Sequence, residues 1–160
     1  MEIYILRHGI AEEGAPGRPD SERRLTSEGK DKLRATLACA RQAGVKPGVV
    51  LSSPYVRTRE TAEVARQELK LRDVTIIESS TLTPMEDAEQ AWSEIRVHKD
   101  TAQLLVVGHE PHLSSLISFL IGGGAIDFKK GALARVDVDS LGPRPSGALV
   151  WLLTAKLAGA

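Results

Sequence analysis

Near its start the chain reads Ile3-Tyr4-Ile5-Leu6-Arg7-His8-Gly9. The first four residues are apolar without polar alternation, which is typical of a strand buried on both faces of a sheet. Similar apolar runs follow at 49–51, at about 74–77 and at 104–107, and segments with helical spacing of apolar residues separate them. This alternation predicts an α/β fold, a three-layer α/β/α sandwich with a mainly parallel central sheet.

The helices between these strands carry recognisable ends. Thr26 is a plausible N-cap for the first helix, and Gly44 is placed to end it. Ser53-Pro54 has the order of an N-cap and a first helical residue. Two further helices are expected around 88–95 and 113–120. Residues 133–138 partly alternate and predict an edge or half-exposed strand, and a more apolar strand follows at 148–153.

Composition narrows the class of protein. The 160 residues suit a single domain spanning 1–160. Lys plus Arg and Asp plus Glu both number 21, so no basic excess indicates a nucleic-acid partner. No stretch approaches the roughly 20 apolar residues of a membrane span, and no secretory signal is visible. We therefore expect a cytoplasmic protein with no nucleic-acid or membrane partner. The lone cysteine, Cys39, is expected to pack in the core.

The polar residues follow three of the predicted strands. The first strand runs into Arg7-His8-Gly9, the second into Ser52-Ser53-Pro54 with Arg57 beyond it, and the fourth into Gly108-His109-Glu110-Pro111. Ligands of parallel sheets bind at the carboxyl ends of the strands. Helix N-termini at about Pro54 and Pro111 favour anions, and arginine forks bind phosphate oxygens. The pattern therefore predicts a site for a phosphoryl group.

The chemistry of such a site needs a nucleophile, and His8 is the natural candidate because neutral imidazole is nucleophilic near pH 7. Arg7, Arg57 and His109 would neutralise the oxygens of the phosphoryl group during transfer. Gly9 lacks a side chain that could obstruct the approach. No cofactor is needed for this reaction.

Other interpretations of the same residues exist. His109 alone could cap its own helix, and Arg57 alone could be a solvated charge. His8, His109 and His112 could in principle ligate zinc. The two arginines beside them would repel a cation, so we expect no metal site.

Together these motifs resemble those of the histidine phosphatase superfamily. Arg7-His8-Gly9 is similar to its first motif, and Gly108-His109 to the motif that carries its second histidine. Residues 53–61 resemble the second motif, which places the phosphate arginine at Arg57 and leaves Arg59 outside the pocket. The resemblance implies a phosphoglycerate mutase-like fold and a phosphohistidine intermediate on His8.

Within the superfamily the chain resembles the small SixA-like phosphohistidine phosphatases. Residues 20–29 match their Asp-x-x-Arg-x-Leu-Thr-x-x-Gly pattern, which implies that Asp20 and Arg23 line the pocket mouth; a salt-bridged loop with a helix cap explains them equally well. Residues 128–132 resemble the loop before a late strand of this group. Glu110, directly after His109, is a further candidate for substrate binding.

One departure from the superfamily bears on the substrate. Many members carry a glutamate after the third strand, whereas this chain has Leu82-Thr83-Pro84 there. Alkoxide leaving groups need a general acid, and a phosphoramidate needs one less. The resemblance and this departure together imply hydrolysis of phosphohistidine on a protein, either a histidine-phosphotransfer domain or a phosphocarrier. Asp20, Glu86 or Asp87 could replace the missing acid, in which case small phosphomonoesters become the alternative substrates. A phosphohistidine-binding module without catalysis is the alternative of another class.

Overall fold

The computed structural model describes residues 1–160 and contains one six-stranded sheet. The strands are β1 (Glu2–Arg7), β2 (Val49–Ser52), β3 (Ile76–Glu78), β4 (Gln103–Gly108), β5 (Leu133–Ser140) and β6 (Ser146–Leu153), in the spatial order β3-β2-β4-β1-β5-β6. The first four strands are parallel, and β5 and β6 are antiparallel to their neighbours. The predicted sandwich with a mainly parallel sheet is confirmed.

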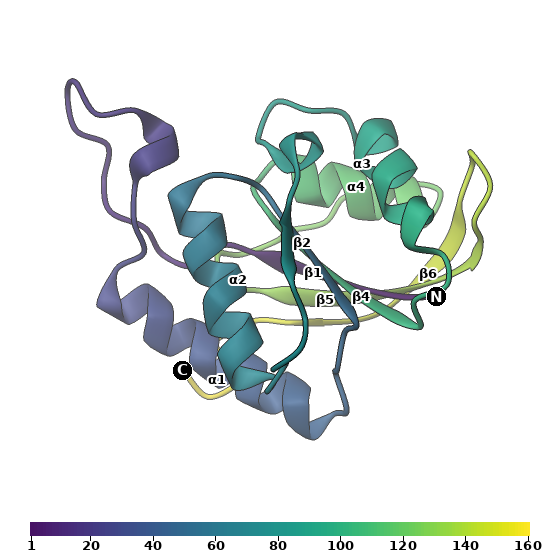
Figure 1. The fold of residues 1–160 in the computed structure, drawn as a ribbon, viewed down its shortest axis with the longest axis horizontal. Coiled ribbons are helices and arrows are strands. Elements are labelled where there is room, and N and C mark those ends of the chain that lie inside the picture. The colour runs from purple at the N-terminus through teal and green to yellow at the C-terminus, as the bar shows by residue number, and fades with distance from the viewer.

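Helices cover both faces of the sheet (Figure 1). On one face lie α1 (Ser27–Gln42) and α2 (Val56–Glu68), and on the other lie α3 (Ala88–Ile95) and α4 (His112–Leu120). Side chains of β1 alternate between the two cores: Ile3 and Ile5 face α3 and α4, whereas Tyr4 and Leu6 face α1 and α2. Residues 3–6 of β1 are all apolar because both faces of this strand are buried. None of the helices combines the length and apolar character that a membrane crossing requires.

Two predictions about local structure were wrong, and one of two alternatives for a third was wrong. The helix after β2 begins at Val56 and not at Pro54, because Ser53 and Pro54 still belong to the turn that leaves the strand. Residues 133–138 are not at an edge, since β5 pairs with β1 on one side and β6 on the other, but the partial exposure predicted for them is seen at Arg135 and Asp137. Cys39 is exposed on α1, where the buried positions are instead taken by residues such as Leu33, Leu37 and Ala40.

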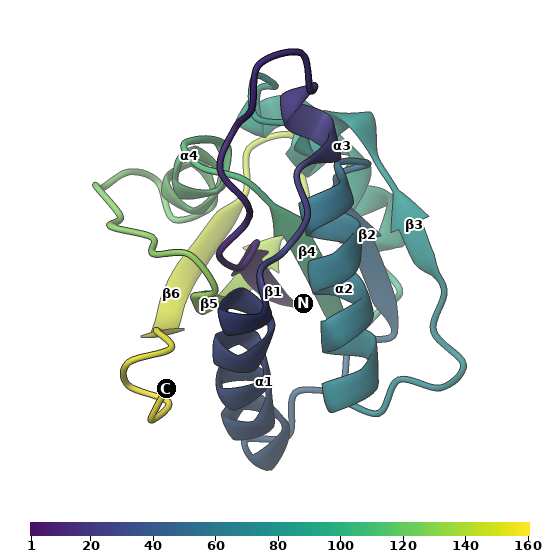
Figure 2. The same ribbon diagram turned by 90° about the vertical axis from the view of Figure 1, so that its left-hand side faces the viewer.

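The carboxyl ends of β1, β2 and β4 meet at one edge of the sheet because the three strands are adjacent and parallel. The long connection between β1 and α1, which contains the short 3-10 helix η1 (Asp20–Glu22), rises beside this edge in Figure 2. Thr26 caps α1, its side chain accepting from the amide of Gly29 at 3.0 Å as the sequence indicated. This cap sets the point at which the connection returns to the body of the protein.

Candidate active site

His8 lies one residue beyond the end of β1 and is 7% exposed. Its Nδ1 is 2.7 Å from the carbonyl oxygen of Gly9. Because a carbonyl only accepts, Nδ1 carries the proton, and Nε2 presents a lone pair. Arg57 Nε donates to this Nε2 at 3.3 Å. The geometry therefore orients an unprotonated nitrogen towards a guanidinium group.

Arg57, in the first turn of α2, is 4% exposed and holds the two sides of the site together. Besides His8, it donates from Nη1 to the carbonyl oxygen of Asp20 at 2.7 Å and from Nη2 to the Asp20 carboxylate at 2.8 Å. Arg23 also donates to this carboxylate, at 2.8 Å, and to the carbonyl of Glu12. The structure thus joins Asp20 to Arg57 directly and Arg23 to Arg57 through Asp20, which is the salt-bridged loop of the second alternative. That this pair lines the pocket mouth stays a prediction.

His109 follows β4 and is 1% exposed. Its ring centroid lies 5.2 Å from that of His8, and its Nε2 is 2.8 Å from the hydroxyl of Ser53. The ring of Tyr55 packs edge-on against it at 4.9 Å, and the Arg57 guanidinium lies 4.9 Å from the same Tyr55 ring. These contacts hold His109 beside His8.

Two nitrogen atoms at the site are buried without a hydrogen-bond partner, Arg7 Nε and His109 Nδ1. The other end of the Arg7 guanidinium is anchored, since Nη1 donates to the carbonyl of Phe128 at 2.6 Å. Buried donors in folded proteins nearly always have a partner, so the unpaired Arg7 Nε, whose charge acts on His8, is a candidate for binding an anion.

The electrostatics keep both histidines neutral near pH 7. Burial, and then the positive charges of Arg57 and Arg7, lowers the pKa of His8 to about 4. Burial also holds the pKa of His109 far below its usual range, with His8 and Arg57 adding to the effect. A neutral imidazole is the nucleophilic form, so the free site is poised for attack on an electrophile.

The structure gives a reason for Gly9 in addition to the predicted one, which stays a prediction. A Cβ atom on Gly9 would lie 2.8 Å from Leu33 Cδ1 and 3.0 Å from the carbonyl oxygen of Gly29, both on α1. The absent side chain therefore makes room for a helix. The amide of Gly9 donates to Thr61 Oγ1 of α2 at 3.3 Å, which holds this backbone segment against α2.

The remaining candidates lie around this centre. Glu110 accepts a hydrogen bond from the amide of Ser114. Burial lowers the pKa of Arg7, and the negative charge of Glu110 opposes this shift only in part. His112 is 2% exposed and both its ring nitrogens lack partners. Burial lowers the pKa of His112, and the backbone of Asp87 and the negative charges of Glu86 and Asp87 oppose this shift. No three His, Cys, Asp or Glu side chains gather as a metal-ligand set.

Some residues of the site were not singled out from the sequence. Ser53, Tyr55 and Thr61 all contact the histidines or Gly9. They belong to the motif at 53–61, so their spacing near Arg57 was the available signal. The carbonyl of Phe128, which anchors Arg7, could not be found this way because backbone groups carry no sequence signature.

A profile of the histidine phosphatase superfamily, branch 1, matches residues 3–86, which is more than half of the chain. The chain therefore belongs to this superfamily, as its motifs indicated. Within it, the chain is SixA-like. It is 29% identical to the phosphohistidine phosphatase SixA of Escherichia coli (strain K12) over 157 residues, covering 96% of this chain and 94% of that protein.

The solved structures agree with this placement. The structure of the protein histidine phosphatase SixA complexed with tungstate matches with a TM-score of 0.88 at 28% identity, covering 98% of both chains. The alpha-ribazole phosphatase from Shigella flexneri matches with a TM-score of 0.76 over 97% of both chains. At 16% identity, the second likeness concerns the fold alone.

Proposed function

We propose that this phosphatase removes the phosphoryl group from phosphohistidine on a protein, through a phosphohistidine intermediate on His8. The observation that carries the proposal is the His8 ring. Its protonated Nδ1 is fixed on Gly9, and its unprotonated Nε2 accepts a hydrogen bond from Arg57, which an incoming phosphoryl group would replace. Arg7 Nε and His109 Nδ1 are buried without a partner, and both are proposed to donate to the phosphoryl oxygens once the substrate is bound.

The proposed reaction has two displacements on phosphorus. In the first, the lone pair of His8 Nε2 forms a P–N bond while the P–N bond of the substrate breaks. The substrate imidazole leaves neutral because its other ring nitrogen, the one not bonded to phosphorus, carries a proton. In the second, a water oxygen bonds to phosphorus and the bond to His8 breaks. Phosphate is released with the two protons of the water, and His8 returns to its neutral form. Arg7, Arg57 and His109 stabilise the charge on the transferring group in both steps.

The carboxylate that bonds to Arg57 is poorly suited to donate a proton. Asp20 bonds to Arg57, but the hydrogen bond from Arg23, aided by Arg57, holds the pKa of Asp20 below its usual range. An ionised carboxylate cannot act as a general acid. Glu86 and Asp87, the other candidates, lie near His112. This arrangement favours a leaving group that needs no acid, which is the property of a phosphoramidate and not of a phosphate ester.

The proposed partner is a phosphorylated histidine-containing signalling or phosphocarrier protein. The E. coli relative is named as a phosphohistidine phosphatase, which supports a substrate of this class. Tungstate is a tetrahedral oxyanion like phosphate, and its presence in the related SixA structure supports an anion site in this fold. Asp20, Arg23 and Glu110 are proposed to shape the approach to that site.

The test compares two substrates without added metal: a phosphorylated histidine-phosphotransfer protein and an aryl phosphate. We expect rapid phosphate release from the protein and weak activity on the aryl phosphate. His8→Ala should abolish turnover, and a rapid quench of the wild type should trap a base-stable phosphoenzyme. His98→Ala, outside the site, is the matched control. Full activity of His8→Ala would refute the nucleophile, and a strong preference for the aryl phosphate would assign the enzyme to small phosphomonoesters.

A further inference from the structure

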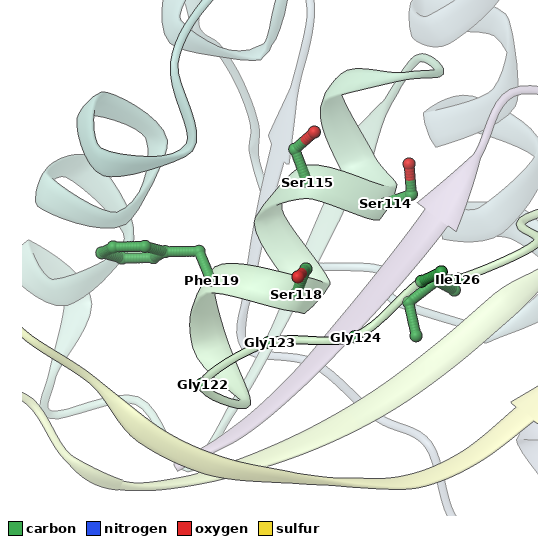
Figure 3. A pocket seen from close by; sticks show the side chains of 9 residues that line it. Ser114, Ser115, Ser118, Phe119, Gly122, Gly123, Gly124 and Ile126 are labelled. Carbon is green, nitrogen blue, oxygen red and sulfur yellow. The ribbon is translucent and has the colours of Figure 1, made fainter.

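A groove of about 710 Å³ runs along the exposed side of α4 (Figure 3). We call it the α4 groove. One wall is α4 itself and the other is the segment that follows it. No charged side chain lines it; three serines, Phe119, three glycines, Ala125 and Ile126 form its surface. The function proposed above makes no use of this surface.

The groove leads towards the candidate active site. At one end, the amide of Ser114 bonds to Glu110, the residue after His109. The opposite wall continues from Ile126 to Phe128, whose carbonyl anchors Arg7. In Figure 3 the groove passes from Gly122 towards Ser114 and Ile126, on the side of the arrowhead of β1. A chain whose phosphorylated residue occupied the site could therefore continue along α4.

The second wall offers an unpaired main chain. The amide of Gly123 bonds to the carbonyl of Ser118, but no backbone hydrogen bond involves residues 124–127. These residues have no regular secondary structure and are largely exposed. A Cβ atom on Gly122, Gly123 or Gly124 would meet nothing within 4 Å, so the space above this wall is open. Free amides and carbonyls on an exposed segment can pair with the main chain of an added peptide.

Side-chain recognition is weak in the same groove. The hydroxyls of Ser114 and Ser115 donate back to the carbonyl of Pro111 and are thus already engaged. The groove has no charge with which to select a charged ligand. Small hydroxyl and glycine surfaces instead permit the close approach of a polypeptide backbone. These features fit a peptide better than a sugar or nucleotide, which would need oriented polar side chains.

We propose that the α4 groove binds an extended, uncharged stretch of the protein substrate that flanks its phosphohistidine, through main-chain hydrogen bonds to residues 124–126. This inference rests on the proposed function and adds to it a determinant of protein over small-molecule substrates. At about 3.3 Å per extended residue, the three lining residues of this wall would pair with roughly three residues of the substrate.

The test measures two substrates, a synthetic peptide with a central phosphohistidine and phosphoramidate itself. Ser118→Arg fills the groove with a long side chain without touching the residues proposed to act on the phosphoryl group. We expect the KM for the peptide to rise about tenfold, the effect of losing about two main-chain hydrogen bonds. The kcat/KM for phosphoramidate should stay within about twofold of the wild type. Gln67→Arg, an exposed position near the far end of α2, adds the same charge and should change neither value.

A second measurement addresses the pairing directly. Methylating the peptide amides one at a time should raise the KM at about two positions on one side of the phosphohistidine, since alternate amides of a paired strand face its partner. An unchanged peptide KM in Ser118→Arg, or an equal loss with both substrates, would refute the groove while leaving the proposed function intact. A wild type that hydrolyses aryl phosphate but neither phosphoramidate nor the peptide would instead refute the proposed function.

Discussion

Replacing Gly29 by alanine should destabilise the protein through a single backbone contact. A Cβ atom at this position would lie 2.2 Å from the carbonyl oxygen of Ile10, 2.8 Å from its nitrogen and 3.0 Å from its carbonyl carbon. All three atoms belong to the backbone, so no change of rotamer can relieve the overlap. The Ile10 carbonyl also accepts hydrogen bonds from the amide and hydroxyl of Thr26, the cap of α1. A shift of Ile10 would therefore weaken the start of the helix.

The sign of the effect depends on two opposing contributions. Alanine is favoured over glycine within a helix by about 1 kcal/mol. Forcing an extra carbon into a closely packed contact costs about 3 kcal/mol. The net loss in the free energy of unfolding should thus be about 2 kcal/mol, and for a chain of this size the melting temperature should fall by roughly 4–8 °C.

Urea unfolding followed by circular dichroism measures this difference. Gly14→Ala is the matched control, because a Cβ atom there would meet nothing within 4 Å, and it should stay within about 0.5 kcal/mol of the wild type. Since Ile10 is only two residues from His8, kcat should fall in Gly29→Ala even where the variant is fully folded. A stability equal to or above that of the wild type would refute the close approach of α1 to this segment.

Three further outcomes follow from the site. The unfolded chain binds a proton on each histidine near pH 6.5, whereas folded His8 stays neutral down to about pH 4. Between these two pH values, acidification should lower the free energy of unfolding by about 1.4 kcal/mol per pH unit because of His8. Urea titrations of His8→Gln should show a smaller dependence of stability on pH. Arg57→Lys should lower kcat/KM about a hundredfold without altering the circular dichroism spectrum. The reason is that an ammonium cannot reproduce the three directed hydrogen bonds to His8 and Asp20. A fall in kcat/KM of less than about threefold would contradict this role. Ser53→Ala leaves His109 Nε2 without its partner and should lower the free energy of unfolding by about 1–3 kcal/mol, measured in urea. An unchanged free energy of unfolding would contradict the bond between Ser53 and His109.

The sequence by itself determined the layered fold and the edge at which the polar residues meet. Apolar runs such as 3–6 and 104–107 can be satisfied only by strands covered on both faces, and parallel strands bring their carboxyl ends together. Arg7, His8, Arg57 and His109 could therefore be placed near one another before any coordinates were known. The start of α1 was predictable because the capping of Thr26 is a local interaction.

Only the tertiary structure decided the features that depend on distant segments. Cys39 was predicted to be buried because its helical stretch is apolar, but it lies about 240° round α1 from Leu33, off the face formed by Leu33, Leu37 and Ala40, and is exposed. The order of the last two strands depends on long-range pairing, so β5 lies inside the sheet and β6 at its edge. The contact of Asp20 with Arg57 and that of Phe128 with Arg7 join residues far apart in the chain. Such contacts follow from how the connections fold back over the sheet edge, which no local pattern of residues encodes.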